Sequence, residues 1–194
     1  MYNLKTMNDK KGKLFVISGS SGVGKGTLLS LLLKQHPELE LSISATTRNP
    51  RPSEVDGVNY FFTSREDFFE AVNNEDFLEW AEFNGNCYGT KRAWVQKQLS
   101  KGKNLILEIE TQGALQIKQK MPDAILIFIL PPSPEELEKR LRGRNTEDEA
   151  TIQGRLHEAL REIKCADAYD FKVVNDNLDK ALKELESIIN KALQ

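Results

Sequence analysis

Residues 14–27 read Leu14-Phe15-Val16-Ile17-Ser18-Gly19-Ser20-Ser21-Gly22-Val23-Gly24-Lys25-Gly26-Thr27, and this stretch decides the fold. It begins with a short β-branched run and continues as a glycine-rich loop, and the leucines at 28–33 indicate a buried helix. A strand, a glycine-rich loop and a helix in this order are the context of a phosphate-binding loop. Glycines let successive backbone N–H groups converge on phosphate oxygens, and the helix N-terminus adds a partial positive charge. The stretch therefore predicts a site for a nucleoside triphosphate.

The lysine and the threonine of this stretch have separate expected roles. Lys25 is placed to reach the β- and γ-phosphates. The strict motif has Ser or Thr directly after the lysine, but here Gly26 follows, so Thr27 is expected on the magnesium side. The flanking strand and helix disfavour one alternative, an ordinary turn with a solvent-exposed lysine. This motif alone does not exclude a second alternative, a P-loop ATPase of another kind. The residues expected to bind ATP here are Gly19, Ser20, Ser21, Gly22, Val23, Gly24, Lys25, Gly26 and Thr27.

Beyond this stretch, apolar runs alternate with helical patterns. Residues 104–109 and 124–130 are continuously apolar, as expected of parallel strands that helices cover on both faces. Pro134 suits the first turn of a helix, residues 171–174 read as a last strand, and residues 178–192 form an amphipathic closing helix. These elements predict an α/β fold, a doubly wound parallel sheet of the P-loop NTPase kind.

Two segments depart from this alternation. Residues 42–97 are rich in aromatic residues and carry short strand-like pieces at 59–62 and 77–83, which indicates an inserted mixed α/β subdomain. Residues 140–161 are dense in arginine and acidic residues, which suits a mobile helical flap that closes over a site, although a solvated helix face is the alternative.

Composition limits the class of protein. The chain has 194 residues, a net charge of -2, 39% hydrophobic and 29% charged residues, which fits one globular unit. There is no basic excess, so no nucleic-acid partner is expected. The first residues are polar and indicate a frayed tail, and the apolar run at 124–130 is far too short to cross a bilayer. The two cysteines and two histidines lack metal-ligand spacing, so we expect a cytoplasmic protein with free thiols.

A second phosphate site is indicated after the first helix. Arg48 and Arg51 stand three residues apart around a turn that contains Pro50. Paired guanidinium groups suit a phosphate, and the hydroxyls of Tyr60 and Tyr88 are candidate donors to it. Taken singly, each tyrosine would more often be a half-buried packing residue.

A carboxylate in the same segment indicates what else the ligand carries. Strand alternation places Glu79 on one face with Phe77, Ala81 and Phe83, and a carboxylate among apolar neighbours needs a partner. The N1–H and N2–H₂ groups of guanine offer two donors side by side, which adenine does not. Glu79 therefore favours a guanine ligand.

At this point the chain resembles the guanylate kinases over nearly its whole length, from about residue 13 to residue 192. The resemblance rests on motifs in the right order, which are GSSGVGKGT, SATTRNPRPSEVDGVNYFF, FLEWAEFNGNCYGT, LILEIETQGA, PPSPEELEKRLRGRNTEDE and VVNDNLDKA. It implies transfer of the γ-phosphoryl group of ATP, with Mg²⁺, to GMP and dGMP, as part of purine nucleotide metabolism.

The resemblance also implies roles for individual residues. The catalytic residues would be Lys25, Arg48, Arg144 and Arg155. The residues binding the GMP phosphate would be Arg48, Arg51, Tyr60 and Tyr88. The residues reading guanine or lying near the nucleotide would be Ser44, Glu54, Glu79, Thr90 and Glu108. The residues bordering the adenine of ATP would be Arg140 and Asn175.

One motif departs from the family pattern. Family members often carry aspartate at one or both of the positions held here by Glu108 and Glu110. The extra methylene moves each carboxylate by about one bond length. Glu110 is a candidate for the magnesium side, but the sequence leaves open which of the two contacts guanine and which faces hydrated Mg²⁺.

The resemblance further implies how the chain is divided. A tail at 1–12 would precede one domain at 13–192, with its parts a core (13–42, 98–133 and 168–192), a GMP-binding insertion (43–97) and a lid (134–167). A phosphopeptide-binding scaffold module of the same fold is the main alternative, and the intact phosphate loop disfavours it. A kinase for another nucleoside monophosphate is disfavoured by Glu79. The oligomeric state stays open.

Overall fold

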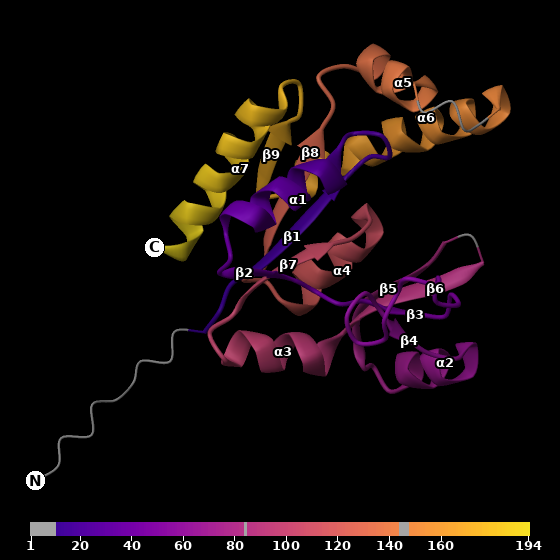
Figure 1. Cartoon of the computed structure of the whole chain (residues 1–194), viewed down its shortest axis with the longest axis vertical. Helices are drawn as coiled ribbons and strands as arrows, with labels where there is room; N and C mark the ends of the chain where they lie inside the picture. The colour runs from indigo at the N-terminus through magenta and orange to yellow at the C-terminus, as the bar shows by residue number, and fades with distance from the viewer. Residues whose placement is uncertain (1–10, 84, 144–147) are drawn as a thin grey trace, which may run out of the picture.

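A parallel five-stranded sheet forms the centre of the protein in this computed structural model, which describes residues 11–83, 85–143 and 148–194 (Figure 1). The strand order is β2-β7-β1-β8-β9, and each neighbouring pair is parallel. The doubly wound sheet predicted from the apolar runs is confirmed. The strand bounds are β1 Leu14–Gly19, β2 Leu39–Leu41, β7 Asn104–Glu108, β8 Ile125–Leu130 and β9 Phe171–Val174.

Helices cover both faces of this sheet, and β1 shows why its sequence is apolar throughout. Phe15 and Ile17 pack against the face covered by α1 and α7. Leu14 and Val16 pack against the opposite face, covered by α3 and α4. Because successive side chains of a strand point to opposite faces, a strand buried on both sides is apolar at every position. The helix bounds are α1 Lys25–Gln35, α3 Arg92–Ser100, α4 Thr111–Lys120 and α7 Leu178–Leu193.

A separate four-stranded sheet is built from the segment between β2 and α3. Its order is β4-β3-β6-β5, and it is mixed, because β3 pairs parallel with β4 and antiparallel with β6. The helix α2 packs on it through Phe68, which stacks on Phe77 with ring centroids 4.5 Å apart. The bounds are β3 Ala45–Thr46, β4 Phe61–Phe62, α2 Arg65–Asn73, β5 Phe77–Phe83 and β6 Asn86–Lys91.

A β-bulge in β5 corrects one expectation about Glu79. Simple alternation places Phe77 on the same face as Glu79, but the pairing with β6 shifts register between these two residues. The extra residue, Leu78, reverses the alternation, so Phe77 packs with Trp80 against α2. Glu79 instead shares the opposite face with Ala81, and both line the cleft described below.

Two helices follow β8 and form a pair. α5 (Pro134–Arg142) begins at the expected proline, and the hydroxyl of Ser133 caps it by accepting a hydrogen bond from the backbone N–H of Glu136. α6 (Glu149–Ile163) continues into the 3₁₀ helix η1 (Lys164–Ala168). The pair has its own small apolar core, formed by Leu137, Leu141, Ile152 and Ala159.

An ion-pair network also joins the two helices of this pair. The guanidinium of Arg142 donates to Glu138 on α5 and to Glu149 on α6. The hydrogen bonds from Arg142 and from Gln153 lower the pKa of Glu149 to about 2. The α5–α6 pair is therefore held together as one unit by contacts that do not involve the rest of the protein.

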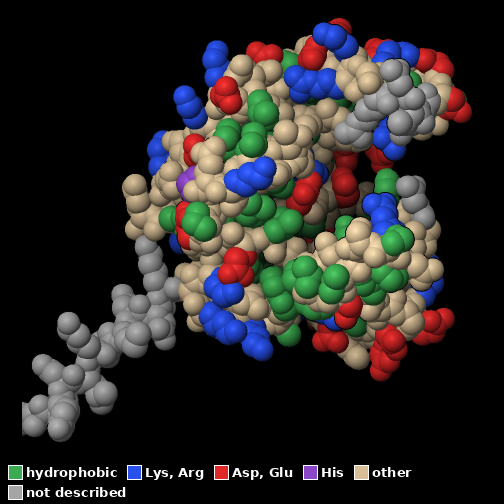
Figure 2. Space-filling model, viewed as in Figure 1, with side chains coloured by type: hydrophobic (Ala, Val, Ile, Leu, Met, Phe, Trp, Pro, Cys, Tyr) green, Lys and Arg blue, Asp and Glu red, His purple; other side chains and the backbone are tan. Residues whose placement is uncertain are grey.

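The elements leave a hollow at one side of the molecule. Figure 1 shows the α5–α6 pair above and the four-stranded sheet below, and Figure 2 shows acidic side chains in the hollow between them. Among the described residues, no helix is both long enough and apolar enough to cross a membrane.

Candidate active site

The phosphate-binding loop joins β1 to α1 as predicted. Gly22 and Gly24 have φ angles of +83° and +90°, a left-handed conformation that residues with a Cβ adopt only at a cost. The helix begins at once, because the N–H of Leu28 donates to the carbonyl of Gly24 at 3.1 Å. The glycines thus free the loop backbone to turn its N–H groups toward a bound anion.

Neighbouring elements hold both of these glycines closely. A Cβ on Gly22 would lie 2.8 Å from Cδ2 of Leu141 on α5. A Cβ on Gly24 would lie 2.7 Å from Nδ2 of Asn175, and the same nitrogen donates to the carbonyl of Val23 at 2.8 Å. The loop is therefore held in shape from two sides.

Lys25 and Thr27 occupy the first turn of α1 but face different surroundings. The Nζ of Lys25 donates to the carbonyl of Gly19 at 3.4 Å and lines the cleft described next. Thr27 is exposed and does not line that cleft. Lys25 thus sits at the junction between the loop and the hollow.

A cleft of about 340 Å³ lies beside the loop. It is walled by the turn after β7, by the first turns of α1 and α4, and by strands of the four-stranded sheet. The predicted site residues that it brings together are Lys25, Ser44, Tyr60, Glu79, Tyr88, Glu108 and Glu110. Residues from both sheets therefore converge on one space, as a two-substrate site requires.

Glu79 is a buried carboxylate on the wall of this cleft. Glu79 is 5% exposed, and the hydroxyl of Thr90 donates a hydrogen bond to its Oε1 at 2.6 Å. Burial raises the pKa of Glu79, and the hydrogen bond from Thr90 opposes that shift. The carboxylate is thus oriented at one oxygen and stands in a poorly solvated place.

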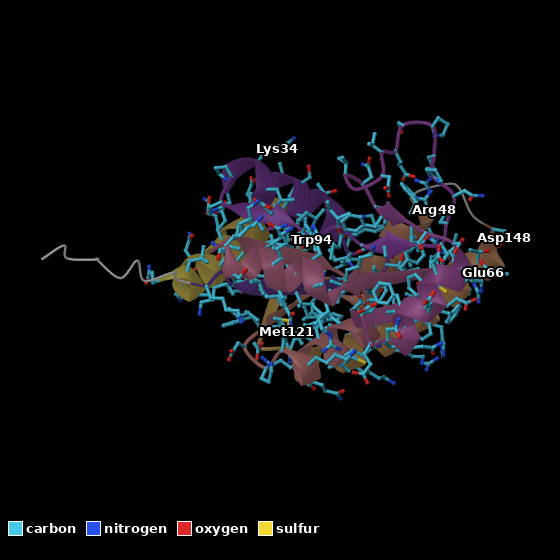
Figure 3. All side chains as sticks on the ribbon, turned by 90° about the horizontal axis from the view of Figure 1, so that it is seen from below. Lys34, Arg48, Glu66, Trp94, Met121 and Asp148 are labelled. Carbon is cyan, nitrogen blue, oxygen red and sulfur yellow. The ribbon has the colours of Figure 1, made fainter. Side chains whose placement is uncertain are left out.

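Arg48, which Figure 3 labels, lies on the loop after β3, and its guanidinium contacts a carboxylate. Its Nη2 donates to both carboxylate oxygens of Glu54, at 2.8 and 2.9 Å, and the backbone N–H of Arg51 donates to the same carboxylate at 2.8 Å. The contact with Glu54 raises the pKa of Arg48 and lowers that of Glu54. The loop therefore carries its own anion beside the arginine.

The two tyrosines lie beside Arg48. The guanidinium carbon of Arg48 is 5.4 Å from the ring centroid of Tyr60, within the range of a cation–π contact. The rings of Tyr60 and Tyr88 meet edge to face with centroids 6.2 Å apart. A cation and two phenols thus gather at one end of the cleft.

Acidic side chains also gather near Lys25. Glu108 ends β7 and Glu110 precedes the first turn of α4. Glu162, near the end of α6, interacts with Glu110 and with Lys25. Burial and the negative charge of Glu110 raise the pKa of Glu162. The α5–α6 pair therefore carries a carboxylate that interacts with Lys25 and Glu110, and sequence reasoning did not single it out.

Comparison with known proteins identifies the family to which the chain belongs. A model of the family described as guanylate kinase matches residues 11–192. The chain belongs to the guanylate kinase family. Guanylate kinase from Synechococcus elongatus is 54% identical over 178 residues, which cover 92% of this chain and 97% of that protein. The crystal structure of guanylate kinase from Anaplasma phagocytophilum has a TM-score of 0.74 and 31% identity, and covers 96% of this chain and 88% of that chain.

The activity of the chain follows from this membership. It is an ATP:GMP phosphotransferase that phosphorylates GMP to GDP. The SH3-kinase fragment of tight junction protein 3 has a TM-score of 0.52 at 12% identity, and covers 95% of this chain and 58% of that chain. That likeness shows the fold alone.

Several residues that the guanylate kinase motifs single out lie away from the cleft wall. Arg140 donates through Nη1 to the carbonyl of Asn175 at 2.9 Å, and Asn175 holds the phosphate loop. Arg51 is exposed, and Arg155 is half-buried on α6 without lining the cleft. Arg144 lies outside the described residues.

The guanylate kinase cleft also contains residues that sequence reasoning missed. Ala81, Gly89, Ile109 and Gly113 line it, and so does Phe83, which is 55% exposed. Strand alternation places Phe83 on the same face as Ala81, so an exposed phenylalanine at this position could have been predicted to line the site. Gly113 gives no such signal, because its importance depends on which element packs against its helix.

Proposed function

We propose that GMP binds in the cleft, with its guanine at Glu79 and its phosphate at the Arg48 end. The observation that carries this proposal is that the buried carboxylate of Glu79 opens into the same cleft as Lys25 of the phosphate-binding loop. Direct transfer requires the acceptor and the donor to share one space, with the reacting atoms about 3–3.5 Å apart.

The chemistry of Glu79 supports guanine as the base. A carboxylate accepts side-by-side hydrogen bonds from the N1–H and N2–H₂ groups of guanine, which adenine lacks. Thr90 uses only part of the acceptor capacity of Oε1. Because a buried carboxylate is costly without partners, guanine compensates this cost with two adjacent donors, whereas adenine presents only one donor, N6–H₂, beside the acceptor N1. We assign Ser44 and Glu108, which line the same cleft, to the surroundings of the base.

The Arg48 end supports a phosphate. Tyr60 and Tyr88 line the cleft there, and their hydroxyls are donors to phosphate oxygens. Arg48 would carry the charge, and Glu54 would hold its guanidinium in place and not touch the nucleotide, because both of its oxygens already accept from Arg48. Arg51 is anchored next to Glu54 through its backbone N–H. Its exposed side chain is free to turn toward the phosphate when GMP enters.

The loop supports the triphosphate of ATP. Its backbone is held open by Gly22 and Gly24, and Lys25 would exchange its bond to the Gly19 carbonyl for the β- and γ-phosphates. Arg140 and Asn175 act on this side by bracing the loop, and contact with adenine remains a prediction for both.

The residues present also fit the Mg²⁺ that accompanies ATP. Mg²⁺ prefers oxygen ligands, keeps several waters, and is held through one or two carboxylates together with phosphates. Among the described residues, no three or more His, Cys, Asp and Glu side chains are grouped to hold a metal, which agrees with a hydrated ion carried by the nucleotide. The hydroxyl of Thr27 and the carboxylate of Glu110 would face it, since Glu110 interacts with Glu162 close to Lys25. When bound, the ion neutralises phosphate charge.

The reaction would then proceed by in-line transfer of the γ-phosphoryl group to a phosphate oxygen of GMP. This oxygen is already ionised near neutral pH, so no covalent intermediate and no strong general base are needed. Lys25 and Arg48 would stabilise the charge that spreads over the transferring group, Lys25 from the donor side and Arg48 from the acceptor side. Arg155 and Arg144 would approach from α6 and from the segment before it.

This assignment implies that the protein closes. We propose a core, a GMP-binding insertion at residues 43–97 and a lid at residues 134–167, because the α5–α6 pair has its own core and its own ion pairs. Arg155 does not line the cleft, so the lid would have to move to bring it to the phosphoryl group. Closure would also exclude water and limit hydrolysis of ATP.

A coupled assay with GMP, dGMP, AMP and UMP, run on the wild type and on Glu79→Gln, tests the proposal. An amide keeps one acceptor and loses the charge, so kcat/KM for GMP is expected to fall on the order of 10- to 100-fold, as for one charge-assisted hydrogen bond. Use of AMP, which makes no such bond, should change little. An equal loss for every monophosphate would show that Glu79 supports the fold and does not read the base.

A further inference from the structure

Gly113 approaches the guanine-reading carboxylate more closely than any side chain would allow. It is the third residue of α4 and lines the cleft. A Cβ built on Gly113 would lie 2.6 Å from Oε2 of Glu79, 3.2 Å from its Cδ and 3.4 Å from its Cγ. Even alanine at this position would therefore compete with the Glu79 carboxylate for the same space.

The backbone of Gly113 gives no separate reason for a glycine. The residue lies within a helix and does not have a positive φ. In a helix interior, glycine is destabilising by roughly 1 kcal/mol relative to alanine. Local stability thus favours alanine, and the reason for glycine must lie in what the helix packs against.

The neighbour that would have to move is held in place. Oε1 of Glu79 accepts the hydroxyl of Thr90 at 2.6 Å, and the residue is 5% exposed. The helix itself is tied to the same strand, because Lys120 donates to the carbonyl of Phe77 at 3.1 Å. A Cβ at position 113 would therefore displace the carboxylate along the cleft and strain the bond to Thr90, while the backbone of both elements stayed in place.

We propose that Gly113 is a specificity-determining positioning residue, whose missing Cβ leaves the space in which the Glu79 carboxylate meets the base of the acceptor nucleotide. The inference rests on the proposed role of Glu79. It adds that selection of guanine depends on the contact between α4 of the central sheet and β5 of the second sheet. Gly113 itself makes no bond to the base and acts only through Glu79.

Gly113→Ala is the direct test, and Gly154→Ala is its matched control. Gly154 also lies inside a helix, α6, but among the described residues nothing comes within 4 Å of a Cβ placed there. Gly113→Ala is expected to lower kcat/KM for GMP on the order of 10-fold, mainly through KM, since a displaced carboxylate bonds the base poorly. KM for ATP and the melting temperature should remain at or above wild type in both variants. Gly154→Ala should leave the kinetics unchanged.

A second substitution separates failure of this inference from failure of the proposed function. Glu79→Ala removes the carboxylate, so in that background Gly113→Ala should cause no further loss for GMP. If Glu79→Ala does not affect GMP selectively, the proposed role of Glu79 is wrong. If Glu79→Ala is selective but Gly113→Ala is as active as wild type, only the role of Gly113 is overturned. Equal further loss in the presence and absence of Glu79, or a lowered melting temperature, would mark Gly113 as a packing residue.

Discussion

The proposed donor side and the proposed acceptor side of this site are built from different parts of the chain. The proposed donor side is one continuous loop, whose backbone N–H groups and Lys25 would meet the phosphates, and left-handed glycines, Asn175 and Leu141 hold its shape. The acceptor side is assembled from side chains that β5, β6, α4 and the loop after β3 contribute separately. One side depends on the course of the backbone and the other on the placement of individual side chains.

The two sides also satisfy their charges differently before substrate binds. On the acceptor side, Arg48 is paired with Glu54, whereas the buried carboxylate of Glu79 accepts only a neutral hydroxyl, that of Thr90, among the described hydrogen bonds. Among the described residues, Lys25 donates a long hydrogen bond to the Gly19 carbonyl and interacts with the carboxylate of Glu162. We infer that substitution of Lys25 affects the chemical step most, whereas substitution of Glu79 affects the choice of nucleotide.

The largest effect is expected at Lys25. Lys25→Ala removes a charge directed at the phosphates, so kcat should fall by about 10²-fold or more, the scale of one preorganised charge contact. The melting temperature and circular dichroism should stay near wild type, because the side chain is not part of the core. Lys34→Ala is the control, since Lys34 is an exposed lysine of the same helix (Figure 3). Activity retained in Lys25→Ala would show that ATP is not held by this loop.

A smaller effect is expected where the donor loop is braced. Asn175→Ala removes the hydrogen bond to the Val23 carbonyl, which is worth roughly 1 kcal/mol and corresponds to about a fivefold rise in KM for ATP. KM for GMP should not change, which separates the two sides. Asn177→Ala is the matched control, because Asn177 caps α7 and its loss should lower stability alone. If both variants lose stability without any change in KM for ATP, Asn175 does not brace the loop.

The smallest effect is expected in stability, on the acceptor side. Burial raises the pKa of Glu79 above its ordinary value of 4.5, so the ionised form costs stability in the folded state. For a group whose folded pKa is raised, its contribution is present below the unfolded pKa and is lost as pH rises through the folded pKa. Glu79→Gln has no such loss. Its melting temperature relative to wild type should therefore rise as the pH increases above the ordinary carboxyl pKa of 4.5.

A fall in the relative stability of Glu79→Gln with rising pH would contradict this prediction. If the variant loses stability relative to wild type as pH rises, the folded protein already stabilises the ionised carboxylate of Glu79. The carboxylate would then not need a ligand to supply its hydrogen-bond partners. A difference that does not depend on pH would indicate lost packing instead.

Features that depend on a residue's own backbone could be predicted from the sequence, whereas contacts between distant residues could not. The phosphate loop and the start of α5 at Pro134 were predictable, because glycines and prolines act on their own backbone. The buried strands were predictable because each is apolar on both faces. The face of Phe77 was predicted wrongly, because a bulge is a property of the pairing between two strands and not of one. Gly113 and Glu162 were missed for a related reason, since each depends on an element distant in sequence that packs against it.

The residue roles on the acceptor side came largely from the resemblance to guanylate kinases. Patterning identifies Glu79 as an unusual carboxylate and Arg48 and Arg51 as a pair, but it does not show that Glu54 engages Arg48. It also does not show that Asn175 lies against the loop, because the two are separated by most of the chain. Such contacts between distant residues require the structure.

A crystal structure of the protein with GMP and a non-hydrolysable ATP analogue tests the central claim most directly. We expect guanine in the cleft, with N1–H and N2–H₂ donating to the carboxylate of Glu79 and with no atom of the base filling the space of a Cβ at Gly113. We also expect the GMP phosphate beside Arg48, Tyr60 and Tyr88, and the triphosphate on the loop with Lys25 turned away from the Gly19 carbonyl. Guanine bound away from Glu79, or phosphates bound away from the loop, would contradict this claim.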